Sequence, residues 1–286
     1  MKTGTTLISD IDSTSLNPGE VAFWWLGQHS FILKLGDQVI YLDPYLANNP
    51  DRKVPPMFTP RDAAHATLIC GTHDHGDHID WTAWPDLSRA TSATFVVPEL
   101  VRDDVIKKLG ITSDRVLGVD DGTSIEVGGL RLTGVAAAHE LLEQDPATGL
   151  YPYLGYLIEA NGCKVYHAGD TCKYEGLETR VKKLAPIDVA FLPINGRDAR
   201  RLSEGCAGNM TYQEAVDLAG AVDPRLTIPT HFDMFENNSE DPQLFLDYLR
   251  VKFPGLQAQV CEYGEKVLVS GCAVSREASH ETEPSR

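Results

Sequence analysis

The residues with the clearest chemical purpose lie in the stretch THDHGDH, from Thr72 to His78. Three histidines and two aspartates follow the apolar run ATLIC directly, so a strand would deliver all of them to one place. Imidazoles and carboxylates are ligands for divalent metal ions, and packing does not require so many of them at one strand end. The spacing of His73, His75, Asp77 and His78 can direct two pairs of side chains at neighbouring points. The stretch therefore predicts two metal positions side by side.

Four ligands are too few for two ions, because each divalent ion takes about three or four protein side chains. Further candidates lie where three strand-like segments end: His139 after LTGVAAA, Asp170 after KVYHAG and His231 after LTIPT. A carboxylate is the group best suited to bridge two cations, which favours Asp170 for that position. We therefore expect two divalent ions. The imidazoles favour zinc, while two carboxylates without a thiolate also fit manganese or iron.

The elements that must position these side chains follow from the patterning of the chain. Strand-like segments of the first half lie at 21–25, 30–35, 38–44, 66–72 and 94–98, and those of a second series at 123–127, 130–138, 153–160 and 163–170. Helices are expected over 98–110, 177–185, 211–222 and 241–253, and later strands over 187–194, 225–231, 258–263 and 266–270. This order predicts an α/β protein of the α+β kind, with two sheets packed face to face and helices outside: a four-layer αββα sandwich.

Length and composition favour one globular domain. The chain has 286 residues, 42% of them hydrophobic, which is enough to bury a core. We expect a single domain over 1–286, with a compact core at about 18–274 and a disordered polar tail at 275–286. The net charge of −16 opposes binding to nucleic acid or to an anionic membrane. No signal peptide or membrane-spanning run is recognisable, which favours a cytoplasmic protein, and a homo-oligomer is left open.

The series HxHxDH, then His, then Gly-Asp, then His resembles the ligand series of the metallo-β-lactamase superfamily. That resemblance implies one metal on His73, His75 and His139, a second on Asp77, His78 and His231, and Asp170 as the bridge. A finer resemblance covers most of the chain. The segments that are similar to the L-ascorbate-6-phosphate lactonase branch are VAFWWLGQHSFILK, YLDP, THDHGDHID, YHAGDT, IDVAFLPING and NMTYQEAVDLAGAVDPRLTIPTHFDMF.

Three further residues near the ligands are candidates for supporting roles. Asp43 in YLDP could accept a proton from a metal-bound imidazole, or it could simply end its strand in an Asx turn before Pro44. By resemblance, the turn that carries His29 lies near the mouth of the metal cleft, so His29 is a candidate for binding substrate. A surface histidine is the alternative there. His167 is expected to support the ligands or the core rather than to bind a metal.

The loop PINGRDARR concentrates hydrogen-bond donors at a strand end of an acidic protein. Asn195 and Arg197 are candidates for binding an anionic group of the substrate, because arginine offers paired donors to phosphate or carboxylate. Arg200 and Arg201 could join them, or the three arginines could pair with surface carboxylates or with a neighbouring subunit. Asn209 is a further substrate-binding candidate that could instead cap the helix that follows it.

These features together predict a metal-dependent hydrolase. A hydroxide held between two ions would attack a carbonyl carbon or a phosphorus, with Asp77, His139 and Asp170 as the catalytic candidates. The lactonase resemblance favours the opening of a small anionic sugar-acid lactone such as L-ascorbate 6-phosphate.

Three other functions compete with lactone hydrolysis. A phosphodiesterase or nuclease would use the same metal pair, but the acidic charge and the short spacing between Asp170 and His231 count against it. A thioesterase of the glyoxalase II type carries a C-terminal helical domain, and too few residues follow His231 to supply one. A non-catalytic metal-binding protein is the alternative of another class, and the complete ligand series argues against it.

Overall fold

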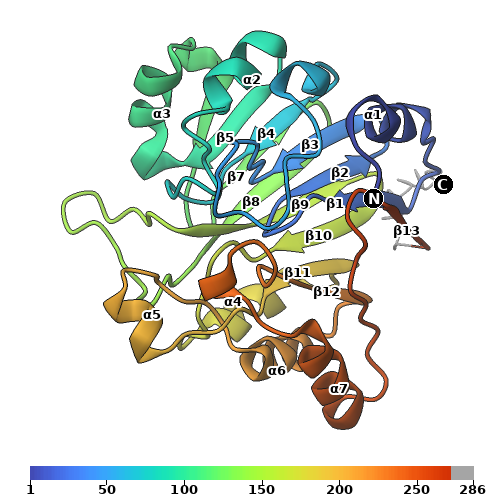
Figure 1. Cartoon of the computed structure of the whole chain (residues 1–286), viewed down its shortest axis with the longest axis vertical. Coiled ribbons are helices and arrows are strands. Elements are labelled where there is room, and N and C mark those ends of the chain that lie inside the picture. Colours follow the sequence, from blue (N-terminus) through green and yellow to red (C-terminus); the bar gives the residue numbers. More distant parts are fainter. Residues whose placement is uncertain (272–286) are drawn as a thin grey trace, which may run out of the picture.

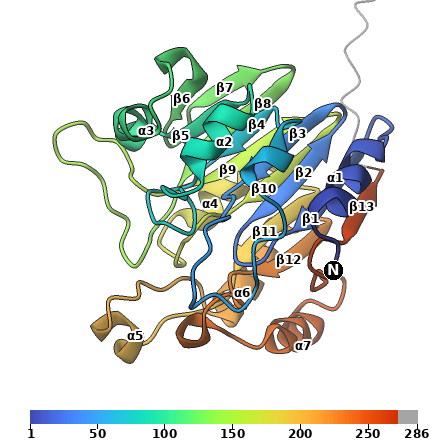
Figure 2. The same ribbon diagram turned by 45° about the horizontal axis from the view of Figure 1, so that its top comes forward.

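The structure is a computed structural model that describes residues 1–271. Two β-sheets are stacked face to face with helices on both outer sides (Figure 1, Figure 2), so the predicted αββα sandwich is confirmed. The strand order is β13-β1-β2-β3-β4-β5-β6 in the first sheet and β12-β11-β10-β9-β8-β7 in the second. The polar tail predicted at 275–286 lies outside the described residues.

Except for β6, the strands lie close to where the sequence predicts them. The first sheet contains β1 (Glu20–Trp25), β2 (Phe31–Leu35), β3 (Gln38–Leu42), β4 (Leu68–Cys70), β5 (Thr94–Pro98), β6 (Val116–Val119) and β13 (Lys266–Ser270). The second contains β7 (Ser124–Val127), β8 (Leu130–Ala136), β9 (Leu154–Ala160), β10 (Cys163–His167), β11 (Val189–Pro193) and β12 (Leu226–Thr230).

Strand direction brings several strand ends to one edge of the sandwich. In the first sheet β3 and β4 are parallel neighbours. In the second, β9 is antiparallel to both β8 and β10, and β10, β11 and β12 are parallel, so β8, β10, β11 and β12 all run the same way. Ligands of open α/β sheets bind beyond the carboxyl ends of the strands. The segments that carry the predicted ligands therefore meet at such an edge.

The helices cover the outer faces of the two sheets. Against the first sheet lie α1 (Gly4–Ser13), α2 (Trp84–Ala90) and α3 (Arg102–Leu109), and against the second lie α4 (Leu177–Lys182), α6 (Tyr212–Val222) and α7 (Pro242–Lys252) (Figure 1). The short α5 (Ala199–Ser203) follows β11. Short 3₁₀ turns occupy Pro60–Ala63, Glu99–Val101, Ser113–Arg115 and Glu236–Asn238. Within the described residues, no helix is long and apolar enough to cross a membrane.

The strand β1 shows how the core is built on both faces of the first sheet. Val21 and Phe23 pack between the two sheets, whereas Ala22 and Trp24 pack toward the helical layer, and all four are fully buried. Successive strand residues point to opposite faces, so a strand that is covered on both faces reads as the continuous apolar run VAFWW.

The compact core begins earlier than the predicted boundary near residue 18. Leu7 and Ile11 of α1 have no exposed surface and pack against the outer face of the first sheet. The ammonium group of Lys34 donates a hydrogen bond to the carbonyl oxygen of Ile11 at 2.7 Å, near the end of the helix. Because threonine, serine and aspartate fill most other positions of α1, its helical pattern is weak in the sequence.

The segment 258–263 is not the edge strand that the sequence predicts. It forms only isolated bridges, from Ala258 to Thr227 and from Tyr263 to Trp25. The helices α2 and α5 and the strand β6 are elements that the sequence pattern did not reveal.

We expect Ile11→Ala to lower the free energy of unfolding by about 2–5 kcal/mol, because it opens a cavity under α1. Thr6→Ala on the exposed side of the same helix should change it by less than about 0.5 kcal/mol. Urea denaturation followed by circular dichroism would measure both. Equal effects of the two substitutions would contradict the packing of α1 on the sheet.

Candidate metal centre

The seven side chains predicted to bind metal lie together at the shared strand edge. His73, His75, Asp77 and His78 follow β4, and the remaining three follow the ends of β8, β10 and β12: His139, Asp170 and His231. Their ligand atoms form three groups within which all atoms lie within 4.8 Å of one another: His73, His75 and His139; His73, His78 and Asp170; and Asp77, His78 and His231.

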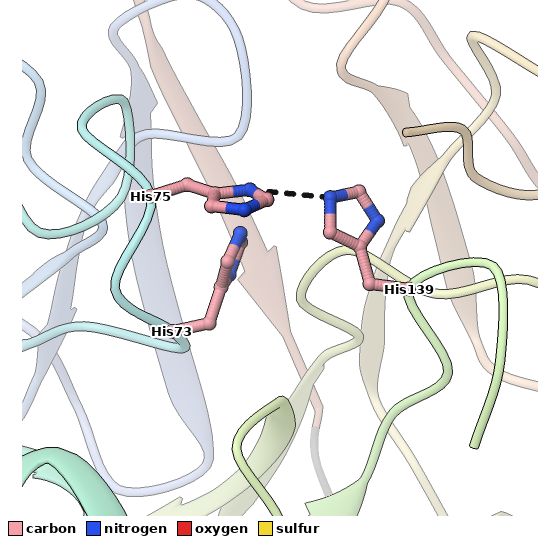
Figure 3. Close-up of side chains that lie close together, drawn as sticks. All are labelled: His73, His75 and His139. Carbon is pink, nitrogen blue, oxygen red and sulfur yellow. Dashed lines mark hydrogen bonds between the residues drawn. The ribbon is translucent and has the colours of Figure 1, made fainter. Parts of the chain in front are cut away.

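The first group gathers three imidazole rings from two segments far apart in the sequence. His73, His75 and His139 point toward one another (Figure 3), and Nδ1 of His75 lies 3.2 Å from Nε2 of His139. Nε2 of His139 also lies 3.9 Å from Oδ2 of Asp170. These are the three side chains that the family resemblance assigns to the first metal position.

The second group surrounds a point on the other side of Asp170. Nε2 of His78 lies 3.7 Å from Oδ2 of Asp77, and Nε2 of His231 lies 3.8 Å from the same oxygen. Asp170 places Oδ1 at 3.4 Å from Nε2 of His78 and Oδ2 at 3.0 Å from Nε2 of His231. Because Oδ2 of Asp170 also faces His139, this carboxylate lies between the two groups, where a bridging ligand would lie.

The chemistry of these atoms fits divalent metal ions. Nε2 of His73, Nε2 of His78 and Oδ1 of Asp170 are buried and have no hydrogen-bond partner. Buried polar atoms are nearly always hydrogen-bonded, and exceptions require an explanation such as an ion. Imidazole nitrogens and carboxylate oxygens at these separations are suitable first ligands for zinc and for similar divalent ions.

Burial and mutual attraction set the protonation of the centre. Burial alone would raise the pKa of Asp170, but the neighbouring His231 and His78 hold that pKa well below its usual range. Burial would lower the pKa of His78, but Asp170, Asp77 and Asp43 raise it well above the usual value. For His73, burial and the adjacent His78 hold the pKa well below the usual value, which keeps this imidazole neutral.

The backbone next to Asp170 adopts a conformation that requires glycine. Gly169, directly before Asp170, has φ 62°, and a Cβ there would lie 2.3 Å from the carbonyl oxygen of Leu154. Only glycine fits that conformation and that close approach. The ligand loop after β4 closes on itself, because the N–H groups of His78 and Ile79 both donate to the carbonyl oxygen of His75.

Asp43 accepts a hydrogen bond from an imidazole of the ligand series, which is the first of the two alternatives for this residue. Its Oδ2 accepts hydrogen bonds from Nδ1 of His78 at 2.7 Å and from Nε2 of His167 at 3.0 Å. Its Oδ1 accepts from the N–H of Thr72 at 2.8 Å. A carboxylate on one ring nitrogen fixes the tautomer, so Nε2 of His78 is left to face the metal position. His167 supports the ligands and is not one of them, as predicted.

His29 lies behind the ligands and not at the mouth of the cleft. Its ring is fully buried, stacks on His167 with the ring centres 4.0 Å apart, and is hydrogen-bonded through Nδ1 to the hydroxyl of Thr230 at 2.7 Å. The prediction that His29 contacts substrate is wrong, because the ring has no exposed surface. The alternative of a surface histidine is equally wrong.

The arginines of the 193–201 loop are held by carboxylates of the chain itself. Arg197 donates two hydrogen bonds to the carboxylate of Glu214, at 2.6 and 2.8 Å, and one to the carbonyl oxygen of Asn209. Arg201 pairs with Asp198 at 2.6 Å, and Arg200 pairs with Glu204 at 3.1 Å. The predicted capture of an anionic substrate by Arg197 is therefore wrong, and pairing with carboxylates is the alternative that holds.

Asn195 and Asn209 are buried and form a chain of amides that leads to the cleft. Nδ2 of Asn209 donates to Oδ1 of Asn195 at 3.1 Å, and Nδ2 of Asn195 donates to Oδ1 of Asn238 at 2.8 Å. Of the three, only Asn238 lines the cleft, so direct substrate contacts of Asn195 and Asn209 do not fit this structure. The following helix is capped by Thr211 and not by Asn209.

The ligands open into a cleft of about 1100 Å³. Five ligands line it: His75, Asp77, His139, Asp170 and His231. Its walls include the aromatic side chains Tyr45, Trp81 and Phe235 and the carboxylates Asp51, Asp80, Glu204 and Glu236. Among the described residues that line this cleft there is no lysine or arginine.

Two residues near the centre, Asp80 and Gln28, were not predicted from the sequence. Asp80 accepts hydrogen bonds from the N–H groups of Leu46 and Ala47, at 2.8 and 2.6 Å, and so holds one wall of the cleft. Its position two residues after His78, in the run THDHGDHID, was a usable signal. Gln28 lies with its side-chain amide 2.7 Å from Oδ2 of Asp77, and nothing in its own sequence context marked it.

The chain is similar to known proteins in sequence and in fold. Residues 39–232 match the family model described as "Beta-lactamase superfamily domain". A UPF0173 metal-dependent hydrolase of Thermococcus onnurineus is 30% identical over 222 residues, which are 77% of this chain and 88% of that protein. A relative of the same description from Methanopyrus kandleri is 29% identical over 226 residues, with the same shares of both chains.

A solved structure has the same fold. Igni18, described as a metallo hydrolase from Ignicoccus hospitalis, superimposes with a TM-score of 0.70 at 24% identity and covers 88% of this chain and 99% of its own.

We expect Asp43→Asn to weaken metal binding by about 10–100-fold, because an amide cannot accept from His78, His167 and Thr72 as the carboxylate does. Competition with a chromogenic chelator would measure the affinity. The matched control is Asp223→Asn, an exposed aspartate with φ 58°, a conformation that asparagine tolerates. Equal affinities of the two variants would refute the orienting role of Asp43.

We expect Arg197→Met to lower the free energy of unfolding by about 1 kcal/mol at pH 7, because it leaves Glu214 without its paired donors. Arg200→Met should have almost no effect, since the Arg200 side chain is 84% exposed. Burial raises the pKa of Glu214, but the hydrogen bonds from Arg197 hold that pKa below its ordinary value of 4.5.

The stabilisation by this ion pair is therefore complete at neutral pH and is lost as the pH falls through the lowered pKa of Glu214. Urea denaturation at several pH values should show the difference between wild type and Arg197→Met shrinking on acidification. A constant difference at all pH values would show that the ion pair is not its cause.

Proposed function

The chain belongs to the metallo-β-lactamase superfamily and is a metal-dependent hydrolase, and we propose that it hydrolyses a carboxylic ester, most simply a lactone, at a centre of two divalent ions. The observation that supports the proposal is the convergence of seven imidazole and carboxylate ligands at the floor of a large cleft. A cleft of this size that opens onto such a cluster is typical of an enzyme that binds a small molecule. The imidazole-rich set makes zinc the first candidate, with manganese or iron as alternatives.

The side chains of the centre have separate roles in the proposed reaction. His73, His75 and His139 would hold one ion, Asp77, His78 and His231 the other, and Asp170 both. Bound ions of this kind lower the pKa of water toward neutrality and polarise a carbonyl oxygen. Asp77 is a part-exposed carboxylate that lines the cleft, and it would take the proton of the attacking water and return it to the departing alcohol.

The charge of the cleft favours an uncharged substrate. No lysine or arginine is among the described residues that line the cleft, and the arginines expected to bind an anion pair with carboxylates. Of the wall carboxylates, Glu204 pairs with Arg200 and Glu236 with Lys53, whereas Asp51 has no ion pair within residues 1–271. Two carboxylate ligands neutralise half of the charge of two divalent ions, so only the floor of the cleft would attract an anion. L-ascorbate 6-phosphate is within the reaction class, but its phosphate would have to lie beside these carboxylates. An uncharged lactone fits the walls better.

The walls offer two kinds of contact to such a substrate. Tyr45, Trp81 and Phe235 provide apolar surface for a ring or an alkyl chain. Asn238 has its Oδ1 engaged by Asn195 and by Arg201 at 2.8 and 3.2 Å, which leaves its amide N–H groups as the end available to a substrate oxygen.

The test is a substrate panel on the metal-loaded protein: uncharged lactones, lactones bearing a carboxylate or phosphate, phosphodiesters and thioesters. We expect uncharged lactones to give the highest kcat/KM, with at least about tenfold discrimination against a charged analogue. Asp170→Ala should lose metal and turnover together. A preference for phosphodiesters or thioesters would replace the lactonase proposal, and full activity of Asp170→Ala would refute the centre itself.

A further inference from the structure

We propose that Gln28 is an additional metal ligand of this chain, binding through its side-chain oxygen at the position formed by Asp77, His78 and His231. The inference rests on the second metal position of the proposed centre. It adds a neutral oxygen to a set of imidazoles and carboxylates.

The position of the Gln28 amide carries the proposal. Its Nε2 lies 2.7 Å from Oδ2 of Asp77 and 3.2 Å from Nε2 of His231. These separations are similar to those between neighbouring ligand atoms around one ion, which lie on the order of 3 Å apart when each bond is about 2 Å long. The end of the Gln28 side chain therefore occupies a corner of the same ligand group.

The orientation of that amide leaves its oxygen without a partner. Gln28 has no exposed surface, and its Oε1 is buried and makes no hydrogen bond. A half turn of the amide exchanges Oε1 and Nε2, because the two ends have the same shape. The turned amide directs Oε1 at the position between Asp77 and His231, where a cation would satisfy it. A buried carbonyl oxygen without a partner costs free energy that such a contact removes.

The backbone of Gln28 is held rigidly in place for this role. Its N–H donates to Oδ1 of Asp233 at 2.9 Å, and its carbonyl oxygen accepts from the backbone N–H of His231 at 3.0 Å and from the indole N–H of Trp25 at 3.1 Å. The residue adopts φ 53°, which is uncommon outside glycine. The bond to His231 couples the turn between β1 and β2 to a ligand at the end of β12.

The preceding glycine allows this turn to approach its neighbours. Gly27 has φ 91°, and a Cβ there would lie 2.9 Å from the end of the Met234 side chain. Because residues with a side chain rarely adopt this φ, a substitution at Gly27 would strain the turn that carries Gln28.

If the Gln28 amide is only a hydrogen-bond donor to Asp77, the expected effect of Gln28→Glu on metal binding is the opposite. If Gln28 only donates a hydrogen bond to Asp77, a carboxylate in its place would repel Asp77 at close range. If Gln28 offers its oxygen to the ion, a carboxylate would serve as well or better, since it is the stronger oxygen ligand. Gln28→Glu therefore separates the two roles, and Gln28→Met removes both with almost no change of shape.

The experiment compares metal content and affinity in the full-length protein, by elemental analysis after dialysis and by competition with a chelator for the more weakly held ion. We expect wild type to retain two ions per chain and Gln28→Met to lose the second, or to bind it at least about tenfold more weakly. Gln28→Glu should bind it as tightly as wild type or more tightly. Thermal unfolding of the metal-free variants checks that each one folds.

Gln243→Met on α7 is the matched control, because the Gln243 amide also donates to a carboxylate, that of Asp247 at 2.8 Å, but lies outside the ligand group. Its metal content should equal that of wild type. The proposal is overturned if Gln28→Met retains the second ion as wild type does, or if Gln28→Glu binds it more weakly than Gln28→Met. A wild type that holds only one ion refutes the dinuclear centre, a failure distinct from that of Gln28.

Discussion

The burial of Asp170 among imidazole rings is the constraint on which the rest of the structure depends. A carboxylate that is almost fully removed from water is tolerated only where positive charge and donors surround it, and His78 and His231 lie within 3.4 Å of its oxygens. Each of these rings must also direct its Nε2 toward Asp170. The hydrogen bond to Asp43 fixes the orientation of the His78 ring. The positive φ of Gly169 gives the backbone the conformation that brings Asp170 next to these rings.

The two sheets contribute unequal parts of this arrangement. The first sheet supplies the dense ligand loop after β4 and the carboxylate of Asp43 after β3, and the second supplies single ligands after β8, β10 and β12. The stacked rings of His29 and His167 join the two sheets behind the ligands. Since the centre spans the sandwich, its geometry depends on the packing of the whole core, and a shift of one sheet against the other would separate the two halves of each ligand group.

The distribution of charge separates the floor of the cleft from its walls. The ligands concentrate positive potential at the floor once ions are bound, whereas the walls carry carboxylates and aromatic rings. Arg197 and Arg201 pair with Glu214 and Asp198, and the wall carboxylates Glu204 and Glu236 are paired with Arg200 and Lys53.

The sequence by itself predicted the sandwich and the seven side chains that gather at one edge of it, because strand periodicity and the residue types at strand ends can both be recognised locally. It also offered Asp43 as a hydrogen-bond acceptor for one of these imidazoles, a contact that the structure contains. Only the tertiary structure decided which groups the side chains of Arg197, His29 and Gln28 contact. An arginine pairs with whichever carboxylate lies nearest in space, a histidine in a turn can be buried or exposed, and a glutamine 49 positions from Asp77 meets it only when β1 and β4 lie in one sheet. Such contacts depend on distances between segments, which no local pattern encodes.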